Sequence, residues 1–152
     1  AEIEDCTIRD TSDEAIDFDH FSVKCVATHN HIARSLIGVE LNDATDCLVA
    51  GNEFRDCGTG INVWRWCKHP GLNEGNIIAQ NLFERMQGNT IQIAKGTKAN
   101  KILQNEINNS RKNAIILAGE GQIVKANKIT ASGMKDIAIN EGTHDIDVAK
   151  QP

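Results

Sequence analysis

The segment Asn52-Glu53-Phe54-Arg55-Asp56-Cys57-Gly58-Thr59-Gly60-Ile61-Asn62-Val63 is the clearest copy of a unit that recurs along the whole chain. It has an Asn, an apolar residue two positions later, a polar turn ending in Gly, and an Ile-x-Val triplet. Equivalent positions hold Cys6, Asn30, Asn52, Asn81, Asn105 and Asn127. These positions are separated by 24, 22, 29, 24 and 22 residues. A period of this size indicates a solenoid, in which each repeat packs on its neighbours.

An alternating triplet closes each unit, and the six triplets are Ile16-x-Phe18, Val39-x-Leu41, Ile61-x-Val63, Ile91-x-Ile93, Ile115-x-Leu117 and Ile137-x-Ile139. A period of two is typical of a strand, whose successive side chains point to opposite faces. Strands one coil apart would be parallel and about 4.8 Å apart, so equivalent side chains should form ladders. Asn would occupy a sharp turn and satisfy its backbone groups. The chain has no Asn-Gly dipeptide, which disfavours an antiparallel sandwich with tight hairpins.

The Asn-x-Ile ladder and the Gly-Ile-x-Val triplets resemble those of right-handed parallel β-helix proteins of the pectate-lyase-like superfamily, over nearly all of the chain. The resemblance implies the handedness, and it favours an extracellular or cell-surface location. We therefore expect an all-β fold: one single-stranded, right-handed parallel β-helix over residues 1–152, with about six to seven coils of 22–24 residues. The predicted coils comprise residues 2–22, 23–45, 46–75, 76–99, 100–122 and 123–145.

The first residues already fit a strand within a repeat, so we expect the C-terminal portion of a longer β-helix. Its uncovered first coil should join upstream coils or associate with another copy, because unpaired strands invite edge-to-edge pairing. The net charge is −5 and Lys and Arg do not cluster, which disfavours nucleic acid or an anionic membrane as a partner. No apolar run approaches the roughly 20 residues of a membrane span.

The five cysteines do not have the spacing of a disulfide scaffold. Cys6 occupies the Asn position and is expected to be a small buried residue. Cys25 and Cys47 should stack on neighbouring coils, as free thiols or alternatively as a bridge. His29 and His31 lie near these thiols without the spacing of a zinc finger, so no metal centre is expected.

Residues between the inward positions of each triplet should point outward and form two rows. The first row contains Asp17, Glu40, Asn62, Gln92, Ile116 and Ala138. The second row contains Asp19, Asn42, Trp64, Ala94, Ala118 and Asn140. Polar and aromatic side chains concentrate in the first three coils, whereas a merely solvated face would carry charge on every coil. The two rows therefore predict a functional site on coils 1 to 3.

The third coil is about six residues longer than its neighbours, and residues 64–75 form the insertion. Solenoids place insertions on the binding face, and loops carry function on a rigid scaffold. Trp64 would offer an apolar surface to a pyranose ring. Trp66 is instead expected to clamp the loop onto the coil.

These features predict a carbohydrate-active protein with a groove across coils 1 to 4 that binds a polysaccharide and cleaves or modifies it. The catalytic candidates are Asp17, Asp19, His20 and Glu40. The substrate-binding candidates are Asn42, Asn62, Trp64, Arg65, Lys68, His69 and Lys95. Asp17 and Glu40 would be ladder neighbours, so one of them should keep a proton, as glycoside hydrolysis requires.

Two alternatives remain open. The resembled family includes lyases, in which Arg65, Lys68 or Lys95 would neutralise a substrate carboxylate and His20 or His69 would take a proton. A lyase or epimerase of this kind could hold Ca²⁺ in the acidic cluster; no other cofactor is expected. The other alternative is a non-catalytic structural or carbohydrate-binding module of a larger surface or fibre protein.

Overall fold

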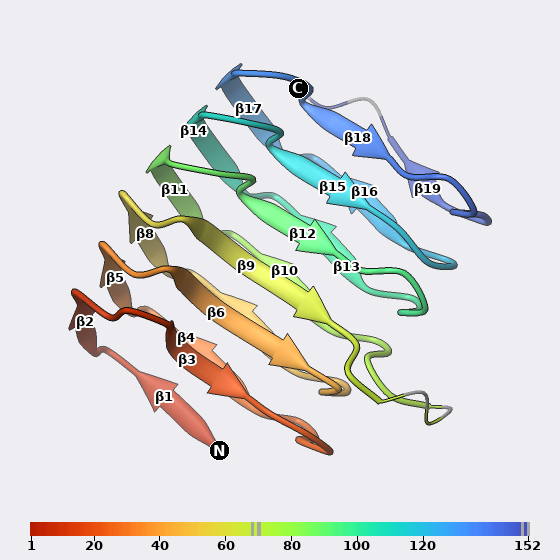
Figure 1. Ribbon diagram of the computed structural model, residues 1–152, viewed down its shortest axis with the longest axis horizontal. Coiled ribbons are helices and arrows are strands. Elements are labelled where there is room, and N and C mark those ends of the chain that lie inside the picture. The colour runs from red at the N-terminus through yellow and green to blue at the C-terminus, as the bar shows by residue number, and fades with distance from the viewer. Residues whose placement is uncertain (68, 70, 150, 152) are drawn as a thin grey trace.

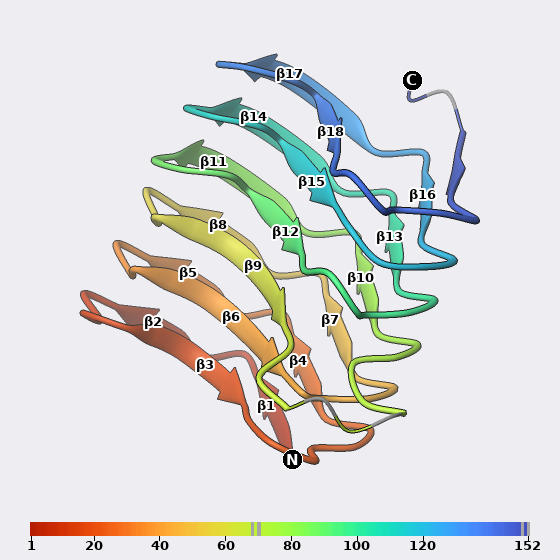
Figure 2. The same ribbon diagram turned by 45° about the vertical axis from the view of Figure 1, so that its right-hand side comes forward.

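The computed structural model describes residues 1–67, 69, 71–149 and 151, and its regular elements are all β-strands. They form three parallel sheets that run side by side along the molecule (Figures 1 and 2). The chain forms one strand in each of the three sheets in turn and then continues into the next coil along the axis. The predicted all-β parallel solenoid is therefore confirmed. None of the described residues belongs to a helix that could span a bilayer.

Each coil contributes one strand to each sheet. Sheet A contains β1 (Glu2–Glu4), β4 (Val26–Thr28), β7 (Leu48–Ala50), β10 (Ile77–Ala79), β13 (Lys101–Leu103), β16 (Ile123–Lys125) and β19 (Asp147–Val148). Sheet B contains β2 (Thr7–Arg9), β5 (His31–Ala33), β8 (Glu53–Arg55), β11 (Leu82–Met86), β14 (Glu106–Ser110) and β17 (Lys128–Ser132). Sheet C contains β3 (Glu14–Phe18), β6 (Ile37–Asn42), β9 (Thr59–Trp64), β12 (Ile91–Ile93), β15 (Ile115–Leu117) and β18 (Ile137–Ile139).

The core lies between the three sheets and is built of stacked equivalent side chains. Ile61 is in register with Ile91, and all atoms of both side chains are buried. Phe54 and Phe83 stack in the same way, with ring centroids 4.7 Å apart and an angle of 11° between the rings. The ring of Phe83 leaves no room for a side chain at Gly60, because a Cβ there would lie 2.6 Å from it. Glycine is thus required by packing at position 60, in β9.

The predicted Asn ladder lies in the turn between sheets A and B and is buried. The Oδ1 of Asn81 accepts hydrogen bonds from the backbone N of Asn52 at 2.9 Å and from its Nδ2 at 3.0 Å. The Nδ2 of Asn81 donates to the carbonyl of Val49 at 2.9 Å and to Oδ1 of Asn105 at 3.0 Å. Each amide therefore ties three coils together while it satisfies turn backbone groups that water cannot reach.

A second ladder lies five residues earlier, in the turn between sheets C and A, and only its two cysteines, Cys25 and Cys47, are expected from the sequence to stack. The Oδ1 of Asn76 accepts from the backbone N of Cys47 at 2.9 Å, and Asn100 does the same for Asn76 at 3.1 Å. Gln122 continues the ladder with its Oε1, 2.9 Å from the N of Asn100. In the first coils Cys25 and Cys47 occupy this position, so thiols replace amides there.

The cysteines are free, which confirms the thiol ladder of Cys25 and Cys47. The backbone N of Cys25 donates to the Sγ of Cys47 at 3.3 Å. The expectation that Cys6 is buried is wrong, since this residue is exposed. It does occupy the ladder position, and its N–H donates to Asn30. It follows β1 and precedes β2, which are end strands of sheets A and B, so no described coil covers it from the other side.

Candidate functional site

The first outward row is confirmed by the register of sheet C. Asp17 pairs with Glu40, Glu40 with Asn62, and Asn62 with Gln92. The row continues through Ile116 to the end of the sheet. In the second row, Asn42 pairs with Trp64. Parallel pairing without a register shift therefore brings predicted site residues from successive coils onto one face, here called the sheet C face.

Two carboxyl groups of the first row are shifted toward their neutral forms. Burial raises the pKa of Glu40, and the hydrogen bond that it accepts from Asn62 Nδ2 at 2.8 Å opposes this shift. Burial also raises the pKa of Asp17, and the negative charge of Asp19 adds to the effect. Both groups are thus suited to hold a proton at a higher pH than an ordinary carboxyl group does.

Asp19 has the opposite character. It accepts hydrogen bonds from the backbone N–H and the ring of His20, and these lower its pKa. The Nδ2 of Asn42 adds a hydrogen bond of 3.0 Å to Asp19 Oδ1. One edge of the sheet C face therefore has carboxyl groups of raised pKa beside one of lowered pKa, a combination from which acid and base pairs are made.

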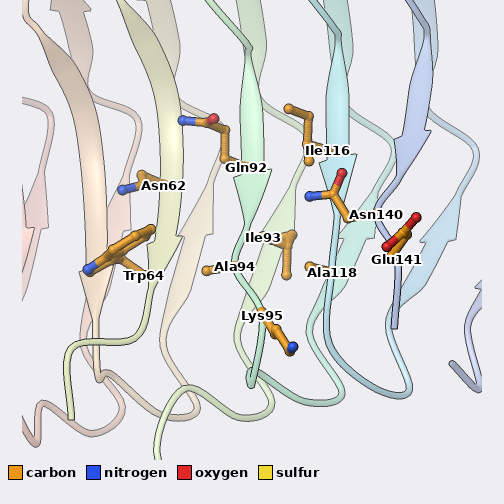
Figure 3. A pocket seen from close by; sticks show the side chains of 10 residues that line it. All are labelled: Asn62, Trp64, Gln92, Ile93, Ala94, Lys95, Ile116, Ala118, Asn140 and Glu141. Carbon is orange, nitrogen blue, oxygen red and sulfur yellow. The ribbon is translucent and has the colours of Figure 1, made fainter. Parts of the chain in front are cut away.

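The concave part of the face lies farther along the solenoid than predicted. A pocket of about 490 Å³ spans coils 3 to 6 and is lined by Asn62, Trp64, Gln92, Ile93, Ala94, Lys95, Ile116, Ala118, Asn140 and Glu141 (Figure 3). Asp17 and Glu40 are not among its lining residues. Of the predicted substrate-binding residues, Asn62 and Trp64 join the pocket to the carboxylate row.

Small residues produce this pocket. Trp64 forms one side and Asn140 and Glu141 form the other, with the short side chains of Ala94 and Ala118 between them (Figure 3). Gln92 and Asn140 already stood in the predicted rows but were not counted as site residues. The sequence signal for the pocket was a run of alanines flanked by larger residues in the second row.

The insertion is held by an arginine and not by the tryptophan expected to hold it. Arg65 donates from Nε to the carbonyl of Cys67 at 3.0 Å and from Nη1 to that of Gly96 at 2.9 Å. It also donates from Nη2 to the carbonyl of His69 at 3.3 Å. Trp66 is 71% exposed, so its predicted clamping role is wrong. The guanidinium of Arg65, a substrate-binding candidate, thus donates to backbone carbonyls of residues 67, 69 and 96.

The other candidates from the insertion and its surroundings do not all lie in the pocket. Trp64 is 44% exposed and presents its ring to the pocket. Lys95 lines the same pocket, below Ile93 in the view of Figure 3. The ring of His69 meets that of Phe21 edge-on, with centroids 6.2 Å apart. Lys68 lies outside the described residues.

Comparison with known proteins identifies the fold family. A family model described as a right-handed β-helix region matches residues 1–132. The structure of the surface protein and adhesin PfbA of Streptococcus pneumoniae aligns with 97% of this chain and 49% of that one, with 19% sequence identity and a TM-score of 0.46. The present chain thus spans about half the length of the adhesin chain. No curated protein sequence matches it.

Proposed function

The chain belongs to the right-handed β-helix family, and we propose that it binds a polysaccharide along the sheet C face. The observation that carries the proposal is the pocket of about 490 Å³ in which an exposed tryptophan ring lies beside three side-chain amides and a lysine. An aromatic ring can pack against the apolar face of a pyranose. A side-chain amide can both donate hydrogen bonds to hydroxyl groups and accept hydrogen bonds from them. The volume is within the usual range for ligand sites.

The shape of the face favours an extended ligand over a single sugar. The pocket residues come from four successive coils, a length of about 14 Å at about 4.8 Å per coil. Asn62 then leads to Glu40 and Asp17, so polar groups continue past the pocket toward coil 1. A glycan chain that lies across the coils would contact, on each coil, one outward residue from each of the two rows.

The charge of the face favours a neutral glycan. Asp17, Asp19 and Glu40 lie at one end of it, and Glu141 lies at the other. A polyuronate would bring its carboxylates against these groups, and like charges at short range repel. Among the described residues, Lys95 is the one cationic side chain that lines the pocket, and the guanidinium of Arg65 donates to backbone carbonyls instead. The arrangement therefore supports a neutral backbone more than the acidic substrate that a lyase would need.

Replacing Trp64 with alanine should weaken polysaccharide binding by about 1–3 kcal/mol, or roughly 5- to 150-fold in Kd, because the ring supplies the apolar contact area. Trp66→Ala is the matched control, since it removes the other tryptophan from the same loop. Calorimetric titration against neutral and uronic-acid polysaccharides measures both effects. Equal losses in the two variants, or tighter binding of the uronic-acid polymers, would contradict the proposal.

A second candidate activity is glycoside hydrolysis at the coil 1 end of the face. It is favoured by the opposite pKa shifts of two carboxyl groups, Glu40 upward and Asp19 downward. In this hypothesis Glu40 is the general acid, and ionised Asp19 is the base that activates water. If the carboxyl groups only bind sugar hydroxyls, the chain is a non-catalytic module with the same polysaccharide site.

A further inference from the structure

Three potential metal ligands meet where the strands of sheet C end on the first coils. His20 follows the second outward row on coil 1, and Asp43 follows it on coil 2. Cys67 comes from the insertion of coil 3. One ligand atom of each of these side chains lies within 4.8 Å of those of the other two. The distance from His20 Nε2 to Asp43 Oδ2 is 3.8 Å.

Asp43 is a buried carboxylate whose hydrogen bonding is incomplete. Its side chain has no exposed surface. Oδ2 accepts the backbone N–H of Cys67 at 2.7 Å. Oδ1 is buried and has no hydrogen-bond partner among the described residues. A buried carboxylate without a full set of partners is costly, and buried charges are normally paired or bound to a metal.

His20 is oriented in the way that metal ligands usually are. Its Nδ1 contacts the carboxylate of Asp19, which points Nε2 toward Asp43. Donation of the Nδ1 proton to a carboxylate fixes the tautomer in which Nε2 carries the free lone pair. A carboxylate behind a histidine is the common outer-shell partner in zinc sites. Asp19 itself is anchored by Asn42, so the whole arrangement is tied to strand β6.

We propose that His20, Asp43 and Cys67 bind one Zn²⁺ ion, which fastens the insertion to coils 1 and 2. Nitrogen, oxygen and sulfur donors together suit this borderline-soft ion, whereas Ca²⁺ takes oxygen ligands only. Three protein ligands leave a fourth position for water. The ion would neutralise Asp43 and fix the chain just beyond Trp64. Zinc binds the thiolate form of cysteine, so binding releases the Cys67 proton to solvent.

A second group of similar composition serves as an internal comparison. Glu120, His144 and Asp145 also lie within 4.8 Å of one another. Here Glu120 already pairs with Lys98 at 3.0 Å, and both His144 and Asp145 are exposed. No buried unpartnered ligand points to a cation at that position among the described residues. The group that contains Asp43 therefore has a buried ligand that lacks a partner, whereas the group that contains Glu120 is an ordinary cluster of surface side chains.

The experiment is a zinc titration of the reduced, chelator-treated chain in competition with a chromophoric chelator. One equivalent should bind, and Co²⁺ should give the near-ultraviolet thiolate charge-transfer absorption that reports a sulfur ligand. Cys67→Ser should abolish that absorption and weaken zinc binding by more than about 100-fold, because even outer-shell partners contribute roughly 10- to 100-fold. His20→Gln should also weaken binding. Cys6→Ser and His144→Gln should leave both measurements unchanged.

Thermal unfolding gives an independent readout. Zinc should raise the Tm of the wild-type chain and leave that of Cys67→Ser unchanged, since a ligand that binds only the folded state stabilises it. The absence of stoichiometric zinc binding would overturn the proposal, as would full affinity in Cys67→Ser. A loss of the bound ion in His144→Gln, or equal affinity for Ca²⁺, would overturn it too.

Discussion

Replacement of Asn81 with leucine is expected to cost at least about 2 kcal/mol of folding free energy. The change leaves the buried backbone N–H of Asn52 without its partner, and it removes one hydrogen bond each from Nδ2 of Asn52, the carbonyl of Val49 and Oδ1 of Asn105. Each unsatisfied buried group costs roughly 1–3 kcal/mol. A domain has only about 5–15 kcal/mol in total, so this loss is a large fraction of its stability. Urea denaturation followed by circular dichroism measures the loss.

The matched control is Asn108→Leu. Asn108 lies in β14, on the outward side of sheet B, and its Nδ2 contacts only the Glu106 carboxylate at 3.3 Å among the described residues. The same chemical change should alter stability there by no more than about 0.5 kcal/mol. A similar loss at both positions would show that stacked amides do not hold the coils together.

Replacement of Glu40 with glutamine should reduce turnover of any glycan that the chain cleaves by about 10²- to 10⁴-fold, the usual contribution of a general acid. The side chain points outward, so the fold and the affinity for the polysaccharide should persist. Burial raises the pKa of Glu40. The acid form is the active one, so the wild-type rate should fall as the pH rises through this raised pKa. Release of reducing ends measures both effects.

Glu84→Gln is the control for that experiment. Glu84 is an equally half-buried, outward carboxylate of β11 on sheet B, and it pairs with Arg55 at 3.2 Å. Turnover should not change in this variant. Full activity of Glu40→Gln would show that Glu40 is not the general acid. The sheet C face would then be a binding surface only.

Much of the fold could be predicted because the repeat period fixes several features at once. Neighbouring coils of a parallel solenoid pair in a fixed register. The position of Asn52 therefore also determines that Ile61 points into the core and that Asn62 points outward. The pairing of Glu40 with Asn62 and of Asn42 with Trp64 followed from the same count of residues. Only the Cys25–Cys47 part of the second ladder could be predicted, because its positions hold three residue types, as Cys47, Asn76 and Gln122 show.

The candidate site was less predictable, because it depends on side-chain size and on a segment without a period. Ala94 and Ala118 make the pocket by being small, an effect that a search for polar residues overlooks. In the insertion, the hydrogen bonds of Arg65 decide the path of the chain and leave Trp66 exposed. No repeat pattern encodes those contacts. The hydrogen bond from the backbone N–H of Cys67 to the Asp43 carboxylate could therefore be found only from the structure.

The central claim, that the sheet C face binds a neutral polysaccharide, is tested most directly by fluorescence titration of Trp66→Phe. This variant keeps Trp64 as its single tryptophan, because the chain contains two. Saturable change of Trp64 emission with a neutral oligosaccharide, at a Kd that matches calorimetry, is the predicted result. The change should be absent with uronic-acid oligomers. Calorimetric binding that leaves Trp64 emission unchanged would place the ligand elsewhere on the solenoid and contradict the claim.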